Sequence, residues 1–304
     1  MRVVSLLPSA TEVLCAVGGE SLLVGRSHEC DFPPSILDRP ALTSQRTSAT
    51  SSAEIDAEVR ESLGEGESLY QLDEERLRAL EPDVILTQDL CDVCSIDLSS
   101  VRRFASTLEK EPRIVSLDPG TVFDVFDDLL TVGRAIGREK EGEEAMVALR
   151  ARYWEAVDYV NPYANQPEVA FIEWADPPFA GGHWTPGLIE AAGGTHSLNA
   201  SGQPSRQVTP EEIIETMPDR VVLCPCGFDL KRTEEELLLI QQTNWWKMLP
   251  AVQDGNVALV DGCAMFNRPG PRLVDAFRWL VAWLQDRPEV LPADFPARLV
   301  TEAP

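Results

Sequence analysis

Basic residues are scarce in this sequence, and lysine is the scarcest of them. Of the 304 residues, 26 are lysine or arginine and 50 are aspartate or glutamate, which gives a formal net charge of −24 at pH 7. The four lysines are Lys110, Lys140, Lys231 and Lys247. A surface this acidic repels nucleic acids and anionic membranes, so we exclude both as partners.

Long hydrophobic runs are also lacking, and none approaches the roughly 18 apolar residues of a membrane-spanning helix. The N-terminal stretch "MRVVSLLPSATEVLCAVGG" is interrupted by polar residues and has no small-residue cleavage site, so we interpret it as a strand, a turn and a helix rather than a signal peptide. The seven cysteines, an odd number with CxxC and CPC spacings, favour thiols in a reducing compartment over a disulfide framework. These features predict a cytoplasmic protein.

Strand and helix patterns alternate over the first 120 residues. The predicted strands are "RVVSLL", "SLLVGRS", "DVILTQ" and "RIVSLD". The first predicted helix, "SATEVLCAVGG", has Ser9 as a potential N-cap and Glu12 as its capping-box partner. This β-α-β alternation predicts a parallel sheet covered by helices on both faces.

The segment 121–160 contains no proline, and its apolar residues recur at helical spacing. One continuous helix here would be about 60 Å long, a length suited to linking two lobes. The alternating pattern resumes at "EVAFIEW" and ends with "GPRLVDAFRWLVAWLQD". We therefore predict an α/β protein with mainly parallel sheets in two lobes, residues 1–120 and 161–304, which are joined by a helix over 121–160 and enclose a ligand cleft.

Unusual side chains follow the predicted strands, where parallel sheets place their ligands. The aromatic side chains among them favour a large flat ligand, because aromatic rings bury much area at low entropic cost. The candidate ligand-binding residues are Pro8, Ser9, His28, Glu29, Cys30, Asp31, Gln88, Glu173, Trp174, His183, Trp184, Gly227, Phe228, Phe266 and Asn267.

A metal site is a second hypothesis for the same loops. Imidazole and thiolate groups are the usual zinc ligands, and a CxxC motif allows two thiols to reach one ion. The candidate ligands are His28, Cys30, Cys91 and Cys94. The alternatives are cysteines that are buried as small hydrophobic residues and a redox-active CxxC pair.

Several motifs, in this order along the chain, resemble the cobalamin-type substrate-binding proteins of ABC importers. They are "RVVSLLPSATEVLCAVGGESLLVG", "LDEERLRALEPDVILTQ", the long helix, "FAGGHWTPGLIEAAGGTHSL", "VTPEEIIETMPDRVVL" and "FNRPGPRLVDA". The resemblance covers nearly the whole chain and implies the periplasmic-binding-protein fold with a single bridging helix. It also implies a non-catalytic function, with cobalamin or another corrinoid or tetrapyrrole as the ligand.

The resemblance further implies that Glu75 and Glu211 dock onto an ABC transporter, one glutamate on each lobe. The alternative is that both are solvated acids near helix N-termini, where acids are favoured in any case. The rival functions are a cytoplasmic metal-binding protein or enzyme that uses the histidine–cysteine cluster, and a scaffold that has lost its ligand. We expect no enzyme, because the sequence contains no nucleophile elbow, phosphate-binding loop or paired-carboxylate motif.

Overall fold

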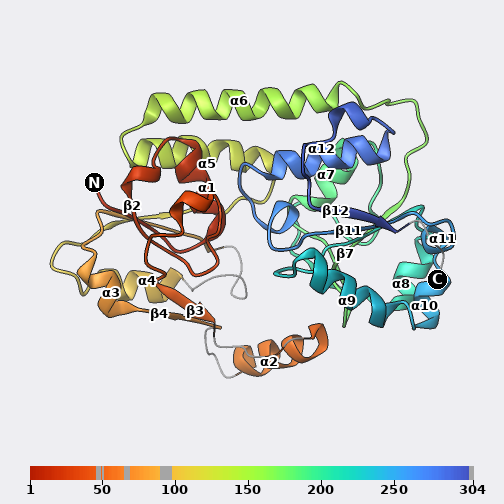
Figure 1. The fold of residues 1–304 in the computed structure, drawn as a ribbon, viewed down its shortest axis with the longest axis horizontal. Helices are drawn as coiled ribbons and strands as arrows, with labels where there is room; N and C mark the ends of the chain where they lie inside the picture. The colour runs from red at the N-terminus through yellow and green to blue at the C-terminus, as the bar shows by residue number, and fades with distance from the viewer. Residues whose placement is uncertain (46–48, 50, 65–68, 90–97, 301–304) are drawn as a thin grey trace. The chain divides into compact units, whose positions relative to one another are not determined.

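The computed structural model describes residues 1–45, 49, 51–64, 69–89 and 98–300. The chain forms two compact units (Figure 1). Unit 1 comprises Met1–Ala49, Ala57–Pro119 and Phe123–Arg150, and unit 2 comprises Thr50–Asp56, Gly120–Val122 and Ala151–Pro304. Within the described ranges, no helix is both long and apolar enough to cross a bilayer.

Unit 1 is built on a four-stranded sheet with the order β2-β1-β5-β6, in which every neighbouring pair is parallel. The strands are β1 (Val3–Ser5), β2 (Leu23–Arg26), β5 (Val84–Thr87) and β6 (Arg113–Ser116). The central strands β1 and β5 are buried along their whole length, as expected for a sheet covered on both faces. All four carboxyl ends therefore lie at one edge of the sheet.

The remaining elements of unit 1 include a small antiparallel hairpin that the apolar pattern of the sequence does not predict. It pairs β3 (Thr43–Gln45) with β4 (Tyr70–Leu72). Helix α2 (Ser52–Gly64) lies between these two strands in the chain, and its residues up to Asp56 belong to unit 2. The other short elements are α1 (Pro8–Ala16), η1 (Glu20–Leu22), η2 (Pro34–Ile36), α3 (Glu74–Ala79) and α4 (Leu98–Ala105).

Unit 2 contains a six-stranded sheet with the order β12-β11-β10-β7-β8-β9. The strands are β7 (Val169–Trp174), β8 (Phe179–Ala180), β9 (Arg206–Gln207), β10 (Arg220–Leu223), β11 (Val257–Val260) and β12 (Ala297–Val300). β7, β10 and β11 are parallel, whereas β8, β9 and β12 join antiparallel.

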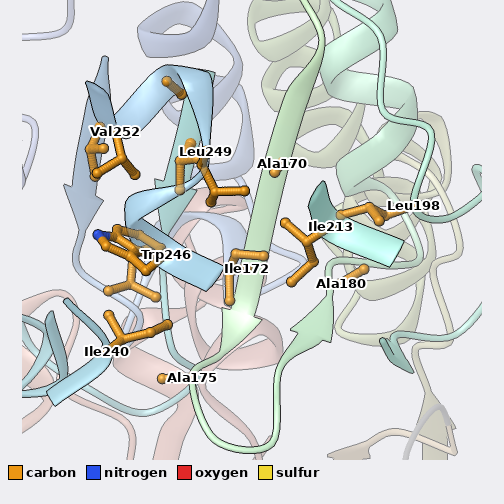
Figure 2. Close-up of a cluster of buried hydrophobic side chains, with 14 of the residues drawn as sticks. Ala170, Ile172, Ala175, Ala180, Leu198, Ile213, Ile240, Trp246, Leu249 and Val252 are labelled. Atoms are coloured by element: carbon orange, nitrogen blue, oxygen red, sulfur yellow. The ribbon is translucent and has the colours of Figure 1, made fainter. Parts of the chain in front are cut away.

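The core of unit 2 packs helices and short loops onto this sheet. Figure 2 shows Ile172 from β7 beside Ile213, with Trp246 and Leu249 also in the cluster. The helical elements are α7 (Thr185–Ala191), α8 (Pro210–Glu215), α9 (Leu230–Ile240), α10 (Asn244–Lys247), α11 (Pro250–Gln253), α12 (Leu273–Leu284), η3 (Met265–Asn267) and η4 (Pro288–Val290). Unit 1 thus has a parallel sheet with helices, and unit 2 has a mixed sheet whose centre, β7, β10 and β11, is parallel. Both arrangements combine strands with helices, which confirms the predicted α/β class.

The expected continuous helix over 121–160 is instead two helices, α5 (Val122–Ala135) and α6 (Glu139–Val157). Gly137 ends α5 in the left-handed conformation with φ 72°, and the Arg138 amide donates to the Gly133 carbonyl at 2.8 Å. This is the bonding pattern of a Schellman C-cap, which glycine allows without a steric penalty. The absence of proline therefore did not ensure an unbroken helix. The predicted domain limits at 120 and 160 stay predictions.

A second local correction concerns the start of α1. Ser9 was expected to cap this helix, but the N-cap residue is Leu7 and Pro8 stands in the first turn. Ser9 is buried inside the helix. Proline is well suited to the first helical position because its fixed φ is already helical and its missing N–H is not needed there.

Candidate functional site

In unit 1, the residues that follow β2 form a hydrogen-bonded cluster with the β3–β4 hairpin. The His28 amide donates to Thr43 Oγ1 at 3.1 Å, and His28 Nδ1 lies 2.7 Å from the same oxygen. The Thr43 hydroxyl itself donates to Ser27 Oγ at 3.0 Å. Because that hydroxyl has only one proton, Nδ1 is assigned as the donor to Thr43, and the lone pair of a neutral His28 ring is then on Nε2.

The His28 imidazole is held in its neutral form. Burial lowers the pKa of His28, and the positive charge of Arg26 lowers it further. Nε2 is buried and has no hydrogen-bond partner among the residues that the structure describes. A neutral imidazole with a lone pair on Nε2 is able to accept a hydrogen bond or to bind a metal centre.

Glu29 and Tyr70 complete this cluster. The Tyr70 hydroxyl donates to Glu29 Oε1 at 3.3 Å, and the Tyr70 and His28 ring centroids are 5.7 Å apart. Thr43 and Tyr70 were not among the sequence candidates, because the hairpin that brings them to β2 is short and weakly apolar. Asp31, in contrast, is exposed.

Cys30 differs from its neighbours because its side chain belongs to the core of unit 1. It is 1% exposed, and its Sγ lies 3.1 Å from Thr11 Oγ1 on α1. Cys91 and Cys94, the other two proposed thiol ligands, lie outside the described residues. Within the described ranges, no group of three or more His, Cys, Asp or Glu side chains could hold a metal ion. The predicted four-residue metal cluster therefore stays a prediction, and the burial of Cys30 does not favour it.

The other strands of the unit 1 sheet bring further candidates to the same edge. Pro8 and Ser9 follow β1, and Gln88 follows β5. Ser9 and Gln88 are buried, whereas Pro8 is half-buried. Asp118 follows β6 and accepts hydrogen bonds from the Ser116 hydroxyl at 3.0 and 3.1 Å.

In unit 2, the end of β7 carries Glu173 and Trp174, both half-buried. The Ser205 hydroxyl lies 2.9 Å from each Glu173 carboxylate oxygen, which fixes this carboxylate. The Trp174 ring packs edge-on against Phe228 with centroids 5.2 Å apart. Trp174 Nε1 is buried and has no partner in the described part of the chain. Ser205 was not predicted as a site residue.

Three of the predicted aromatic ligand-binding residues, Trp184, Phe228 and Phe266, are buried in unit 2 beneath the loops that follow its strands. Trp184 is 7% exposed and donates from Nε1 to the Phe266 carbonyl at 2.6 Å. Phe266 and Phe228 are fully or almost fully buried. His183 is the partly exposed member of this group, and its ring stacks on Trp184 with centroids 5.4 Å apart.

Asn267 holds together the loops that follow β10 and β11. Its Nδ2 donates to the carbonyls of Cys224 and Gly262, each at 3.1 Å. The Gly227 amide donates to the same Gly262 carbonyl at 2.9 Å. A Cβ at Gly262 would lie 1.8 Å from the Pro225 carbonyl oxygen, so only glycine fits there. Asn267 thus positions the loops, and Gly227 is the exposed residue at their tip.

The cysteines of this edge differ in their burial. Cys224 is fully buried, and this burial, followed by the Glu173 charge, raises the pKa of its thiol well above the usual value. Cys226 and Cys263 are half-buried. The proposed docking residues Glu75 and Glu211 are both exposed and lie in the first turns of α3 and α8.

Comparison with known sequences gives a family match over most of the chain. A family model described as "Periplasmic binding protein" matches residues 3–262. The vitamin B12-binding protein of Vibrio cholerae is 23% identical over 290 residues, which cover 93% of this chain and 89% of that protein. A Bacillus subtilis protein named as an ABC transporter substrate-binding lipoprotein is 24% identical over 206 residues, covering 62% of this chain and 58% of that protein.

Solved structures show the same fold. A periplasmic heme-binding protein from Pseudomonas aeruginosa has a TM-score of 0.74 and 19% identity, and covers 100% of this chain and 99% of its own. The periplasmic vitamin B12 binding protein of Vibrio cholerae has a TM-score of 0.67 and 20% identity, and covers 95% of this chain and 98% of its own.

These matches correct the predicted location. The cytoplasmic expectation is wrong, because the matching family and its relatives are periplasmic or lipoprotein substrate-binding proteins, which work outside the cytoplasmic membrane. An odd cysteine number and the composition of the first residues therefore do not determine the compartment.

Proposed function

Because the chain belongs to the periplasmic binding protein family, the substrate-binding components of ABC transporters, we propose that it captures a cobalamin-like corrinoid. Members of this family bind small-molecule solutes and are not enzymes, so the chain is a non-catalytic substrate-binding protein. The proposed cargo is supported by the similarity to vitamin B12-binding proteins over most of the chain.

The observation that carries the proposal is a set of buried polar atoms without partners at the carboxyl ends of parallel strands. Seven such side-chain atoms occur in the described ranges, and four of them stand at or directly after the ends of β2, β5 and β7. These four are Arg26 Nε, His28 Nε2, Thr87 Oγ1 and Trp174 Nε1. Buried polar groups are normally paired, so a ligand with hydrogen-bonding groups at either edge would satisfy the atoms of that edge.

Charge favours a corrinoid over a heme. The side chains at these edges include the acids Glu29, Asp31 and Asp118 in unit 1, and Glu173 and Asp261 in unit 2. A heme carries two propionates, which these carboxylates would repel. A corrin carries neutral amides around its ring, and a cobalamin has only the single negative charge of its phosphodiester, so the repulsion is smaller.

His28 is proposed to contact the metal centre of this cargo. Its Nδ1 is occupied by Thr43, and its lowered pKa keeps Nε2 available at neutral pH. Histidine is a common ligand of such metals through a neutral ring nitrogen. In a His28→Gln variant, the change in the visible spectrum of bound aquocobalamin should be absent, while cyanocobalamin should still bind.

The test of the function is a thermal-stability and absorbance titration with cyanocobalamin, aquocobalamin and hemin. A ligand that binds only the folded state stabilises it by about 2.7 kcal/mol at a hundredfold excess over its Kd. We expect this stabilisation with the corrinoids, and we expect Trp174→Ala to weaken it. Trp154→Ala, which replaces an exposed tryptophan on α6, is the matched control.

The outcomes separate the candidate ligands. Stabilisation by hemin alone would replace the corrinoid with a heme as cargo. The proposal would be overturned if neither the corrinoids nor hemin stabilised the protein at ligand concentrations up to about 1 mM, which is far above a micromolar Kd.

A further inference from the structure

Unit 2 contains a cavity that is separate from the residues proposed for the corrinoid. Its volume is about 240 Å³. Its walls are formed by α12, η3, the part of α6 that follows Ala151 and the loop that precedes β12. The residues that matter here are Arg152, Met265, Asp275, Arg278, Asp294 and Phe295.

The four charged side chains of this cavity, two arginines and two aspartates, form one ion pair. Arg152 forms an ion pair with Asp275, so these two charges neutralise each other. Arg278, one turn further along α12, makes no hydrogen bond or ion pair with any residue that the structure describes. In a chain with a net charge of −24, a half-buried arginine without an acidic partner offers a site for an anion.

The remaining wall is apolar and well supported. The Phe295 ring stacks on Trp279 with centroids 5.3 Å apart and an interplanar angle of 11°. Met265 and Asp294 are both held at positive φ, 49° and 55°. Residues other than glycine adopt this conformation at an energetic cost, and they concentrate at ligand sites. The cavity therefore pairs one available guanidinium with a fixed apolar surface.

We propose that this cavity binds a small monocarboxylate with an apolar body, such as a short aliphatic or aryl acid. The carboxylate would accept two parallel hydrogen bonds from Arg278, and the apolar body would lie against Phe295 and Met265. Phosphate and sulfate fit poorly, because neither ion covers the apolar wall and because Asp294 would repel a dianion more strongly than a monoanion. The cavity size limits the ligand to about ten to fifteen non-hydrogen atoms.

Methyl NMR of the full chain tests this directly. The sequence has five methionines, and Met265 is the one that lines the cavity. Protein labelled at the methionine methyl groups is titrated with hexanoate, and Met265→Leu assigns the reporter signal. We expect the Met265 signal to shift and saturate with a Kd of about 1 mM, while the Met217 and Met248 signals stay fixed.

The charge requirement is tested with matched ligands and variants. Hexanamide, the uncharged analogue, should bind at least tenfold more weakly than hexanoate. Arg278→Gln should also weaken hexanoate at least tenfold, and Arg278→Lys should weaken it less. Arg298→Gln, which removes an arginine paired with Glu234 elsewhere in unit 2, should leave the titration unchanged.

Any of three results would overturn the proposal. The first is the absence of a saturable Met265 shift up to about 20 mM hexanoate, which is twentyfold above the expected Kd. The second is an equal affinity for hexanamide and hexanoate. The third is an unchanged hexanoate affinity in Arg278→Gln. In the absence of ligand, Arg278→Gln should have the same methionine methyl spectrum and melting temperature as the unaltered protein, which would show that this variant folds. Corrinoid binding, followed separately by visible absorbance, should be the same in Arg278→Gln and in the unaltered protein.

Discussion

Asp128 on α5 holds a buried carboxyl group next to other acids. It is 9% exposed, and its Oδ2 makes no hydrogen bond to the residues that the structure describes. Burial raises the pKa of Asp128 to about 7, and the charges of Asp124, Asp118 and Asp127 contribute further. The folded protein therefore keeps this proton at pH values where the unfolded chain, with a pKa near 3.9, has lost it.

This difference predicts that the protein becomes less stable as the pH rises from about 4 to about 7. Because the folded state binds the proton more tightly, the stabilisation is complete below the unfolded pKa and is lost as the pH passes the folded pKa. The loss should be of the order of 4 kcal/mol, since one pKa unit corresponds to about 1.36 kcal/mol and the shift to about 7 spans roughly three units. Asp128→Asn should flatten this part of the pH profile and increase stability at pH 8.

Urea unfolding at a series of pH values measures this effect. Asp127→Asn is the matched control, because Asp127 is exposed and its replacement should leave most of the slope in place. If the Asp128→Asn profile kept the same slope as that of the unaltered protein, another group would be responsible for it.

The stretch His28-Glu29-Cys30-Asp31 shows how far single residues could be predicted. Its position after β2 was correctly inferred from the apolar strand before it. The direction of each side chain was not, because Cys30 contacts Thr11 in the core while His28 contacts Thr43 and Glu29 contacts Tyr70. Such contacts join positions that are distant in sequence, and residue type alone does not specify them.

At the scale of elements, the turn between α5 and α6 depends on three glycines. Gly133 and Gly142 bring the two helices into close contact, since a Cβ on Gly133 would lie 3.1 Å from the Gly142 Cα and 2.9 Å from the Arg138 carbonyl oxygen. Gly137 has no atom within 4 Å of an added Cβ but has a positive φ. Steric contact is therefore the constraint at Gly133, and backbone conformation is the constraint at Gly137.

Two alanine substitutions separate these constraints. Gly137→Ala should cost about 1 kcal/mol in the free energy of unfolding, because an L-residue in the left-handed region loses roughly that amount. Gly133→Ala should cost more than about 2 kcal/mol, because backbone atoms must move apart. Urea unfolding of both variants checks the order, and an equal or smaller loss in Gly133→Ala would contradict the close helix contact.

The predictable elements of this fold are those that bury apolar side chains locally. Continuous apolar runs correctly located β1, β5, β7, β10 and β11, which are central strands. The β3–β4 hairpin and the short strands β8 and β9 were missed, because they are only two or three residues long and because all of them except β8 carry polar residues. Their formation depends on neighbours that the rest of the chain places beside them.

At the scale of the whole molecule, the family is that of the substrate-binding components of ABC transporters, and the sequence predicts one docking glutamate in each unit, Glu75 and Glu211. Neither glutamate is needed to cap its helix. The Asp73 side chain caps α3 by accepting from the Arg76 amide. Thr209 and Glu212 form a complete capping box on α8. Glu75 and Glu211 make no hydrogen bond or ion pair within the described residues, so both are available to basic side chains of a transporter.

We therefore predict that Glu75→Gln and Glu211→Gln weaken binding to the cognate importer without changing cargo affinity. Truncating one member of an interfacial charge pair that is buried in a complex typically costs about 2–5 kcal/mol, so the double variant should lose nearly all stimulation of transporter ATPase activity in reconstituted membranes. Glu74→Gln and Glu215→Gln are matched controls, because both residues are exposed acids on the same two helices. Cargo binding by all variants is measured by visible absorbance. Full ATPase stimulation by the double variant would exclude these two glutamates as docking residues, whereas a parallel loss in the controls would indicate a general effect of negative charge.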